Sequence, residues 1–183
     1  MKGVLFTVFL DGVEAEHGAL FLEALLADLE LPSGGAYTAV GTYDVGEFVQ
    51  VVGAYAGATH RDLPMVLREF GRHLFAALAE RYADVVAGYA GPSEVLFAIE
   101  HLIHPMVRRF YPDAVLPTFD VRPTDQGVRL VYRSHRPLPD LAYGLVEGCL
   151  AHFGCEGFVR MDLEDGGARF DVVMPVACAQ EEP

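Results

Sequence analysis

The sequence predicts an α+β fold in a single domain, residues 1–183, with a helical amino-terminal part packed on a carboxy-terminal antiparallel sheet that has helices of its own. Three observations support this prediction. Apolar residues recur at helical spacing through most of the chain before Pro117. After Pro117 they alternate with a period of two, as in half-buried strands. No linker rich in Pro, Ser or Gly divides the chain, so we expect one domain.

The amino-terminal part contains four segments with helical periodicity. We expect helices over residues 18–30, 45–55, 64–82 and 92–104. Asp44 and Glu47 form a capping-box pattern ahead of the second of these helices. Residues 4–13 fit either period, and their residue propensities alone favour a strand.

The carboxy-terminal part reads as two hairpins separated by one helix. Residues 119–132 alternate around the turn at 124–127, and residues 158–174 alternate around a second turn at 165–167. Between them, apolar residues over 141–153 repeat at helical spacing, and Gly154 is expected to end that helix.

Composition narrows the class of protein. With 26 acidic against 13 basic residues the formal charge is -13, which argues against nonspecific binding of nucleic acid or anionic membranes. No apolar stretch is long enough to span a bilayer, and the amino terminus does not resemble a signal peptide, so we expect a cytoplasmic protein. Cys149, Cys155 and Cys178 lack metal-ligand spacing, and we expect free thiols.

Two segments together suggest a haem site. His104 lies at the end of an apolar helix and can offer an imidazole to iron. Tyr132, Ser134 and Arg136 are spaced two apart, so on one strand face they present two hydroxyls and a guanidinium suited to the haem propionates. Neither segment alone would support this interpretation.

Each of these residues also has an ordinary structural explanation. A lone histidine on an apolar helix is usually a core or surface residue, and Pro105 could simply kink or restart the helix at that point. Residues 132–136 could form the solvent side of a half-buried strand. His101 and His135 are alternative metal ligands.

A set of short motifs, in order along the chain, resembles one known family. The motifs lie at residues 1–3, 70–75, 104–112, 116–119, 132–136, 144–148 and 152–154. With these motifs the chain is similar to the bacterial H-NOX (haem nitric oxide/oxygen binding) domain, which is related to the haem domain of soluble guanylate cyclase. The resemblance covers nearly the whole chain and implies that residues 4–13 form a helix.

The resemblance implies specific roles. His104 would be the proximal ligand of haem b (iron protoporphyrin IX), Pro117 would press on the porphyrin, and Tyr132, Ser134 and Arg136 would bind the propionates. The cysteine/histidine zinc cluster of many members is expected to be absent, because Pro139, Leu163 and Ala168 stand in the corresponding regions.

The resemblance also implies which gas is bound. Oxygen-binding members carry a distal tyrosine five residues after the motif arginine, and this chain has Leu141 there. Tyr143 would be turned about 200° away on a helix. A hydrogen-bond donor favours oxygen, whereas nitric oxide binds without one. The other residues aligned with the pocket are also apolar: Leu5, Phe9, Leu74, Leu78 and Leu145.

We therefore expect a nitric oxide sensor rather than an enzyme. It would also bind carbon monoxide, and it would signal to a separate protein such as a histidine kinase or a cyclic-di-nucleotide enzyme (a diguanylate cyclase or phosphodiesterase). A haem enzyme would need a distal acid/base or a thiolate ligand, and neither is found near the assigned pocket. The alternatives are an oxygen-binding haem sensor and a haem-free domain that binds a small apolar ligand.

Overall fold

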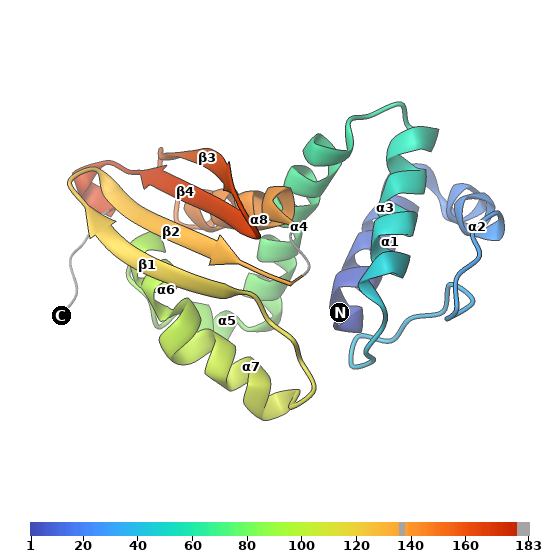
Figure 1. Cartoon of the computed structure of the whole chain (residues 1–183), viewed down its shortest axis with the longest axis horizontal. Helices are drawn as coiled ribbons and strands as arrows, with labels where there is room; N and C mark the ends of the chain where they lie inside the picture. Colours follow the sequence, from blue (N-terminus) through green and yellow to red (C-terminus); the bar gives the residue numbers. More distant parts are fainter. Residues whose placement is uncertain (136–137, 179–183) are drawn as a thin grey trace. The chain divides into compact units, whose positions relative to one another are not determined.

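The computed structural model describes residues 1–135 and 138–178 (Figure 1). Contacts divide the chain into two compact units, and each is described here by itself. The first comprises Met1–Leu67 with Asp113–Val115, and the second comprises Arg68–Pro112 with Leu116–Pro183. The α+β class is confirmed, because helices make up the first unit and the second combines helices with an antiparallel sheet. The single-domain assignment stays a prediction.

The first unit consists of helices α1 (Gly3–His17), α2 (Ala19–Ala27) and α3 (Val45–Ala58). Residue propensity favoured a strand at the start of α1, but the segment is a helix, as the family resemblance implied. Phe6, Phe9 and Val13 are buried at spacings of three and four residues, so the helix gains a continuous apolar face that a strand would divide. Phe6 and Phe9 pack edge-on against Phe48 of α3.

The predicted capping box at the start of α3 is only half formed. The Asp44 carboxylate accepts a hydrogen bond from the Gly46 amide at 2.6 Å, which is ordinary N-capping. Glu47 does not bond back to Asp44. Instead it is buried and accepts hydrogen bonds from the Ser33 amide, the Ser33 hydroxyl and the Tyr37 hydroxyl. The correction has a physical reason: a buried carboxylate needs several donors, and the 33–37 turn supplies three.

The second unit begins within α4. Five helical elements precede its strands in the sequence: α4 (Leu63–Arg81), α5 (Ala83–Val86), α6 (Pro92–Ala98), the π-helix η1 (Ile99–Ile103) and α7 (His104–Phe110). The remainder are strands β1 (Thr118–Thr124) and β2 (Gly127–Arg133), helix α8 (Pro139–His152), strands β3 (Phe158–Glu164) and β4 (Gly167–Val173), and the 3-10 helix η2 (Val176–Cys178).

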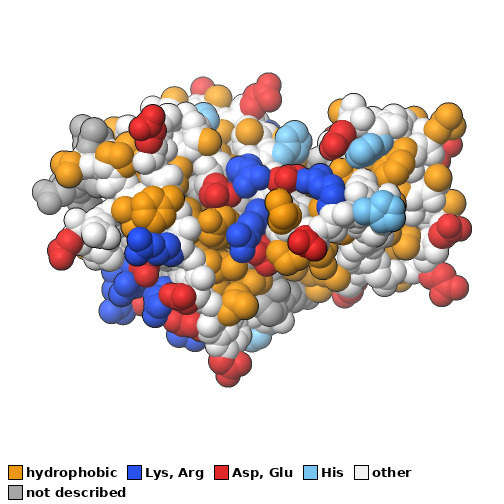
Figure 2. All heavy atoms as spheres, turned by 90° about the horizontal axis from the view of Figure 1, so that it is seen from above, with side chains coloured by type: hydrophobic (Ala, Val, Ile, Leu, Met, Phe, Trp, Pro, Cys, Tyr) orange, Lys and Arg blue, Asp and Glu red, His pale blue; other side chains and the backbone are white. Residues whose placement is uncertain are grey.

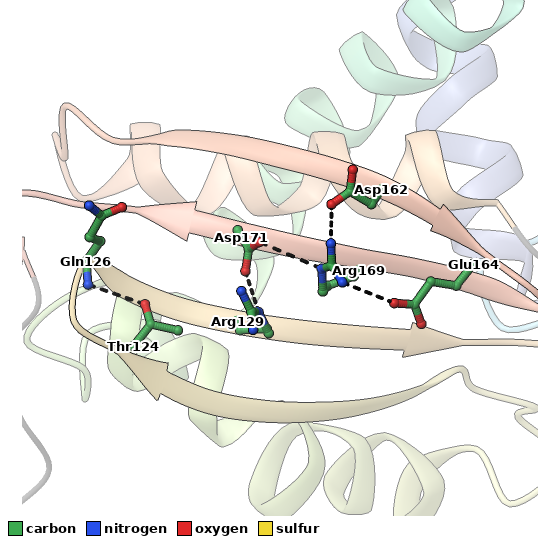
Figure 3. Close-up of polar contacts among 7 residues, drawn as sticks. All are labelled: Thr124, Gln126, Arg129, Asp162, Glu164, Arg169 and Asp171. Carbon is green, nitrogen blue, oxygen red and sulfur yellow. Dashed lines mark hydrogen bonds and ion pairs between the residues drawn. The ribbon is translucent and has the colours of Figure 1, made fainter.

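The sheet has the strand order β1-β2-β4-β3, and all its pairings are antiparallel. Both predicted hairpins are confirmed, and Gly166 adopts φ 71° in the second turn, a value that glycine accepts without strain. One face of the sheet buries Val128, Leu130 and Phe170 in a core shared with apolar residues of α8. On the other face Arg129 pairs with Asp171, and Arg169 pairs with Asp162, Glu164 and Asp171 (Figure 3).

Two of the three cysteines are not free thiols, contrary to expectation. Cys155 and Cys178 form a disulfide, with their Cα atoms 6.0 Å apart. They are 23 residues apart in sequence, so only the fold brings η2 next to the end of α8. Cys149 is free and buried, and burial raises the pKa of its thiol to about 12.

The surface carries mixed side chains. Figure 2 shows acidic, basic and apolar groups interspersed over the face that it presents. No described helix combines the length and the apolar character that crossing a bilayer requires.

Candidate metal centre

His104 lies where the helical path changes its hydrogen-bonding pattern. Helix α6 passes into the π-helix η1, and α7 begins at His104 with Pro105 in its first turn. Proline has no amide hydrogen to donate, so it is tolerated in the first turn of a helix and disrupts a continuous one. The α-helical hydrogen bonding thus resumes at His104, in agreement with the alternative that Pro105 restarts the helix at this point. π-helical turns inside helices occur frequently at functional sites.

The imidazole of His104 is held by one carboxylate. Nδ1 of His104 lies 2.9 Å from Oε1 of Glu100, one helical turn earlier, and the same oxygen accepts a hydrogen bond from the Phe119 amide at 3.0 Å. Within residues 1–135 and 138–178, Nε2 of His104 makes no hydrogen bond. The imidazole is thus anchored through one nitrogen and presents the other.

The surroundings of His104 favour the neutral imidazole. Its side chain is only 12% exposed. Burial lowers the pKa of His104, Glu100 opposes this shift, and the positive charge of Arg108 adds to it. A neutral imidazole with a free nitrogen is the form that binds a metal ion. His101 and His135, the alternative ligands, are both exposed.

The residues predicted to bind propionates do not all lie on one strand. Tyr132 is on β2 and is buried, with its hydroxyl accepting a hydrogen bond from the Leu138 amide at 3.1 Å. Ser134 follows the strand, which ends at Arg133, and its amide donates to the Gly166 carbonyl. Ser134 therefore lies one residue beyond β2 rather than on it, and a propionate-facing side chain at Ser134 stays a prediction. Arg136 lies outside the described residues.

Tyr132 also belongs to an aromatic cluster beside His104. The Phe119 ring lies 6.0 Å from the His104 ring and 5.4 Å from the Tyr132 ring. The alternative that Tyr132 faces solvent is excluded, because it is 4% exposed. Pro117 is half-buried just before β1, two residues from Phe119. The structure thus brings His104, Tyr132 and Pro117 to one end of the β1-β2 hairpin.

The residues predicted to line the gas pocket lie on three helices, with two apolar residues four apart on each. Leu74 and Leu78 are on α4, Leu141 and Leu145 on α8, and Leu5 and Phe9 on α1 of the first unit. Leu74, Leu141 and Phe9 are buried, and the others are half-buried. A spacing of four puts each pair on one helix face.

Helices α4 and α8 meet backbone to backbone. A methyl group on Gly144 would collide with the Arg68 carbonyl, and one on Gly71 would come within 2.7 Å of the Gly144 Cα atom. Two ion pairs flank this glycine contact: Arg68 with Asp140 at 2.8 Å, and Arg72 with Glu147 at 2.6 Å. The crossing holds the backbone around Leu141 in a closely determined position.

Tyr143, the tyrosine nearest to Leu141 in sequence, already has a partner. Its hydroxyl donates a hydrogen bond to the Val159 carbonyl on β3 at 3.0 Å, and the Arg68 guanidinium lies 4.3 Å from the centre of its ring. The expectation that Tyr143 is turned away from the Leu141 side of α8 agrees with these contacts.

Sequence reasoning missed one residue of the site, Glu100. The signal was present, because a carboxylate four residues before a histidine lies on the same helix face. A hollow lined by Gly91, Ser93, Phe153 and Cys178 lies elsewhere in the second unit, and none of the predicted site residues lines it.

Comparison with known proteins identifies the family. The sequence profile of the haem-NO-binding (HNOB) family matches residues 2–160, and no curated protein matches the chain. An H-NOX protein from K. algicida, solved in the ferrous unliganded state, is 33% identical with a TM-score of 0.88; the match covers 96% of this chain and 97% of that one.

Two further solved structures extend the comparison. The H-NOX from Shewanella woodyi, solved bound to IWP-051 in the Fe(II)CO state, is 31% identical with a TM-score of 0.83, covering 98% of this chain and 97% of that chain. An H-NOX protein from S. oneidensis in the Fe(II)NO state is 26% identical with a TM-score of 0.88, covering 96% of this chain and 99% of that chain.

This chain therefore belongs to the haem-NO-binding family and is an H-NOX domain. H-NOX domains bind haem and sense diatomic gases, and they are sensor domains rather than catalysts. The residues present fit that cofactor, since a partly buried imidazole whose pKa is lowered and whose Nδ1 is anchored presents its other nitrogen as a ligand.

Proposed function

We propose that this H-NOX domain is a nitric oxide sensor in which His104 is the axial ligand of haem b. The observation that carries the proposal is the state of the His104 side chain. Its Nδ1 lies 2.9 Å from Glu100, its Nε2 makes no hydrogen bond within the described residues, and partial burial lowers its pKa and so favours the neutral form. An imidazole of this kind is the usual proximal ligand of haem iron in gas-binding proteins.

Other residues of this chain would hold the porphyrin. The Tyr132 hydroxyl accepts from Leu138, which leaves its own hydrogen to donate to a propionate. Ser134 would add a second hydroxyl and Arg136 a guanidinium, the group best suited to fork onto a carboxylate. Pro117 would bear on the macrocycle with a rigid apolar ring. When bound, haem would supply an iron that takes up a diatomic gas.

The side chains aligned with the gas site favour nitric oxide and carbon monoxide over oxygen. Leu141 stands where oxygen-binding relatives carry a tyrosine, and Leu5, Phe9, Leu74, Leu78 and Leu145 are equally unable to donate a hydrogen bond. The hydroxyl of Tyr143 is occupied by the Val159 carbonyl. Bound oxygen is the more polarised ligand, so it loses more from the lack of a donor.

The signal would leave through the helix that carries His104. If gas binding weakened the bond between His104 and the haem iron, His104 would be free to move with α7. The chain that follows α7 reaches Asp113. The Asp113 carboxylate is bonded to Thr42 and to Lys2, at 3.2 Å, in the first unit. A shift of α7 would therefore disturb these contacts of the Asp113 carboxylate. For a tenfold change in partner affinity, the gas-free and gas-bound states need differ in binding free energy by only about 1.4 kcal/mol.

The partner we propose is a signalling enzyme in the cytoplasm, either a histidine kinase or a cyclic-di-nucleotide enzyme (a diguanylate cyclase or phosphodiesterase). The support is the family resemblance, together with a net charge of -13, which suits a protein partner better than nucleic acid.

The test compares gases on purified, haem-loaded ferrous protein and on two variants at one position. Nitric oxide and carbon monoxide should each change the Soret band, while air should produce no stable new spectrum. Leu141→Tyr adds a donor and should lengthen the lifetime of an oxygen-dependent spectrum, whereas Leu141→Phe, of similar bulk without a hydroxyl, should not. A long-lived oxygen-dependent spectrum in the unmutated protein would reclassify it as an oxygen sensor. A protein without a Soret band after expression with haem precursor would be a haem-free apolar-ligand domain.

A further inference from the structure

One carboxylate oxygen links the helical segment of His104 to the sheet. Oε1 of Glu100 is 2.9 Å from His104 Nδ1 and 3.0 Å from the Phe119 amide nitrogen. Glu100 lies in the π-helix η1, and Phe119 is the second residue of β1. The Glu100 side chain is 22% exposed, so both bonds lie in a partly desolvated setting where they are stronger than in water.

The first bond determines which nitrogen of His104 can bind a metal. An ionised carboxylate only accepts hydrogen bonds, so Nδ1 of a neutral His104 must carry the hydrogen and Nε2 must carry the lone pair. A hydrogen bond from Nδ1 to a carboxylate also raises the basicity of the opposite nitrogen. Glu100 therefore selects the tautomer and strengthens the nitrogen that faces away from it.

The second bond determines how the imidazole is oriented. Because the Phe119 amide is part of the β1 backbone, it holds the shared oxygen at a set position relative to the sheet. The Phe119 ring lies 6.0 Å from the His104 ring, so one residue of β1 contacts both the carboxylate and the imidazole. His104 is thus positioned against β1 as well as by its own helix.

We propose that Glu100 is a positioning residue that orients His104, fixes its tautomer and increases the electron donation of Nε2 toward the haem iron. This inference rests on the proposed role of His104 as the iron ligand. It adds a function to a residue outside the propionate and gas-pocket sets. It also predicts that Glu100 tunes how readily the ligand is released when gas binds.

The experiment measures the iron–histidine stretching frequency by resonance Raman spectroscopy of ferrous, gas-free, haem-loaded protein. Glu100→Gln keeps the shape of the side chain but replaces the anion with a weaker neutral acceptor, and Glu100→Ala removes the acceptor. The frequency should fall in both variants, more in Glu100→Ala, and the haem dissociation rate of Glu100→Ala should rise about 10–100-fold. Glu94→Gln is the matched control, because Glu94 accepts from the Ala90 amide and does not contact His104. Its frequency should equal that of the unmutated protein.

A parallel measurement on His104→Gly separates the two proposals. If the band is lost in His104→Gly but is unchanged in both Glu100 variants, His104 is the ligand and the role of Glu100 is refuted. If the band persists in His104→Gly, the proposed ligand is wrong and the inference falls with it. A downward shift in both Glu100 variants, with loss of the band in His104→Gly, supports both.

Discussion

The two sides of the predicted haem site are built in different ways. On the His104 side, a π-helix and a proline interrupt the helical hydrogen bonds, and one carboxylate ties the segment to β1. On the Leu141 side, α4 and α8 touch through glycines and are flanked by two ion pairs. The His104 side is held by a small number of separate hydrogen bonds, such as those of Glu100 with His104 and Phe119. The Leu141 side is close-packed, because the α4 and α8 backbones approach too closely to admit a Cβ atom at Gly71 or Gly144.

This difference bears on how a sensor of this kind would work. Segments with few buried contacts and irregular hydrogen bonding open at lower free energy than close-packed ones. The close-packed α4-α8 crossing would stay in place when a gas binds beside it. Any displacement would then occur in the His104 segment. We therefore expect the Leu141 side to set which gas is bound and the His104 side to move.

The largest effect is expected on the His104 side. His104→Gly should lose the protein ligand of the iron and should retain haem poorly unless free imidazole is added, because imidazole can occupy the vacated volume. Haem content and the ferrous absorption spectrum measure this. His101→Gly is the control, since His101 is exposed three residues earlier and should leave both unchanged. A wild-type ferrous spectrum for His104→Gly without imidazole would contradict the assignment.

An intermediate effect is expected at the α4-α8 crossing. Gly144→Ala places a methyl group against the Arg68 carbonyl and should lower the free energy of unfolding by about 1–3 kcal/mol, the usual cost of overpacking. Gly53→Ala in α3 is the matched control. No atom lies within 4 Å of the added methyl there, so the substitution should stabilise the helix by about 0.5–1 kcal/mol. Denaturant unfolding measures both. Equal stability of the two variants would show that the crossing is not tightly packed.

The smallest effect tests whether Tyr143 contributes only to stability. Tyr143→Phe removes the hydroxyl bonded to the Val159 carbonyl and should cost about 0.5–1.5 kcal/mol of unfolding free energy. The response of the haem-loaded protein to air and to nitric oxide should stay the same. If this variant changed the lifetime of an oxygen-dependent spectrum, the Tyr143 hydroxyl would reach the gas site. Its role would then not be confined to stability, and Leu141 and its apolar neighbours alone would not set which gas is bound.

The sequence predicted the elements well where local pattern was enough. Both hairpins and the helix 141–153 were found from periodicity and turn residues, because alternation and glycine turns are local signals. Residue propensity did not predict the first helix, because valine and phenylalanine are common in strands. Its apolar face is buried by packing against α3. Family resemblance, rather than physical reasoning from residues, supplied that helix and most of the site roles.

The sequence by itself determined the net charge, the order of elements, the position of His104 before the motif predicted to bind propionates, and the absence of a donor at Leu141. The tertiary structure decided the features that depend on residues far apart in sequence. It paired Cys155 with Cys178, assigned the donors of Ser33 and Tyr37 to Glu47, and joined Glu100 to the amide of Phe119. A hydrogen bond or disulfide needs its partners within a few ångströms, and for residues distant in sequence only the folded chain meets that condition.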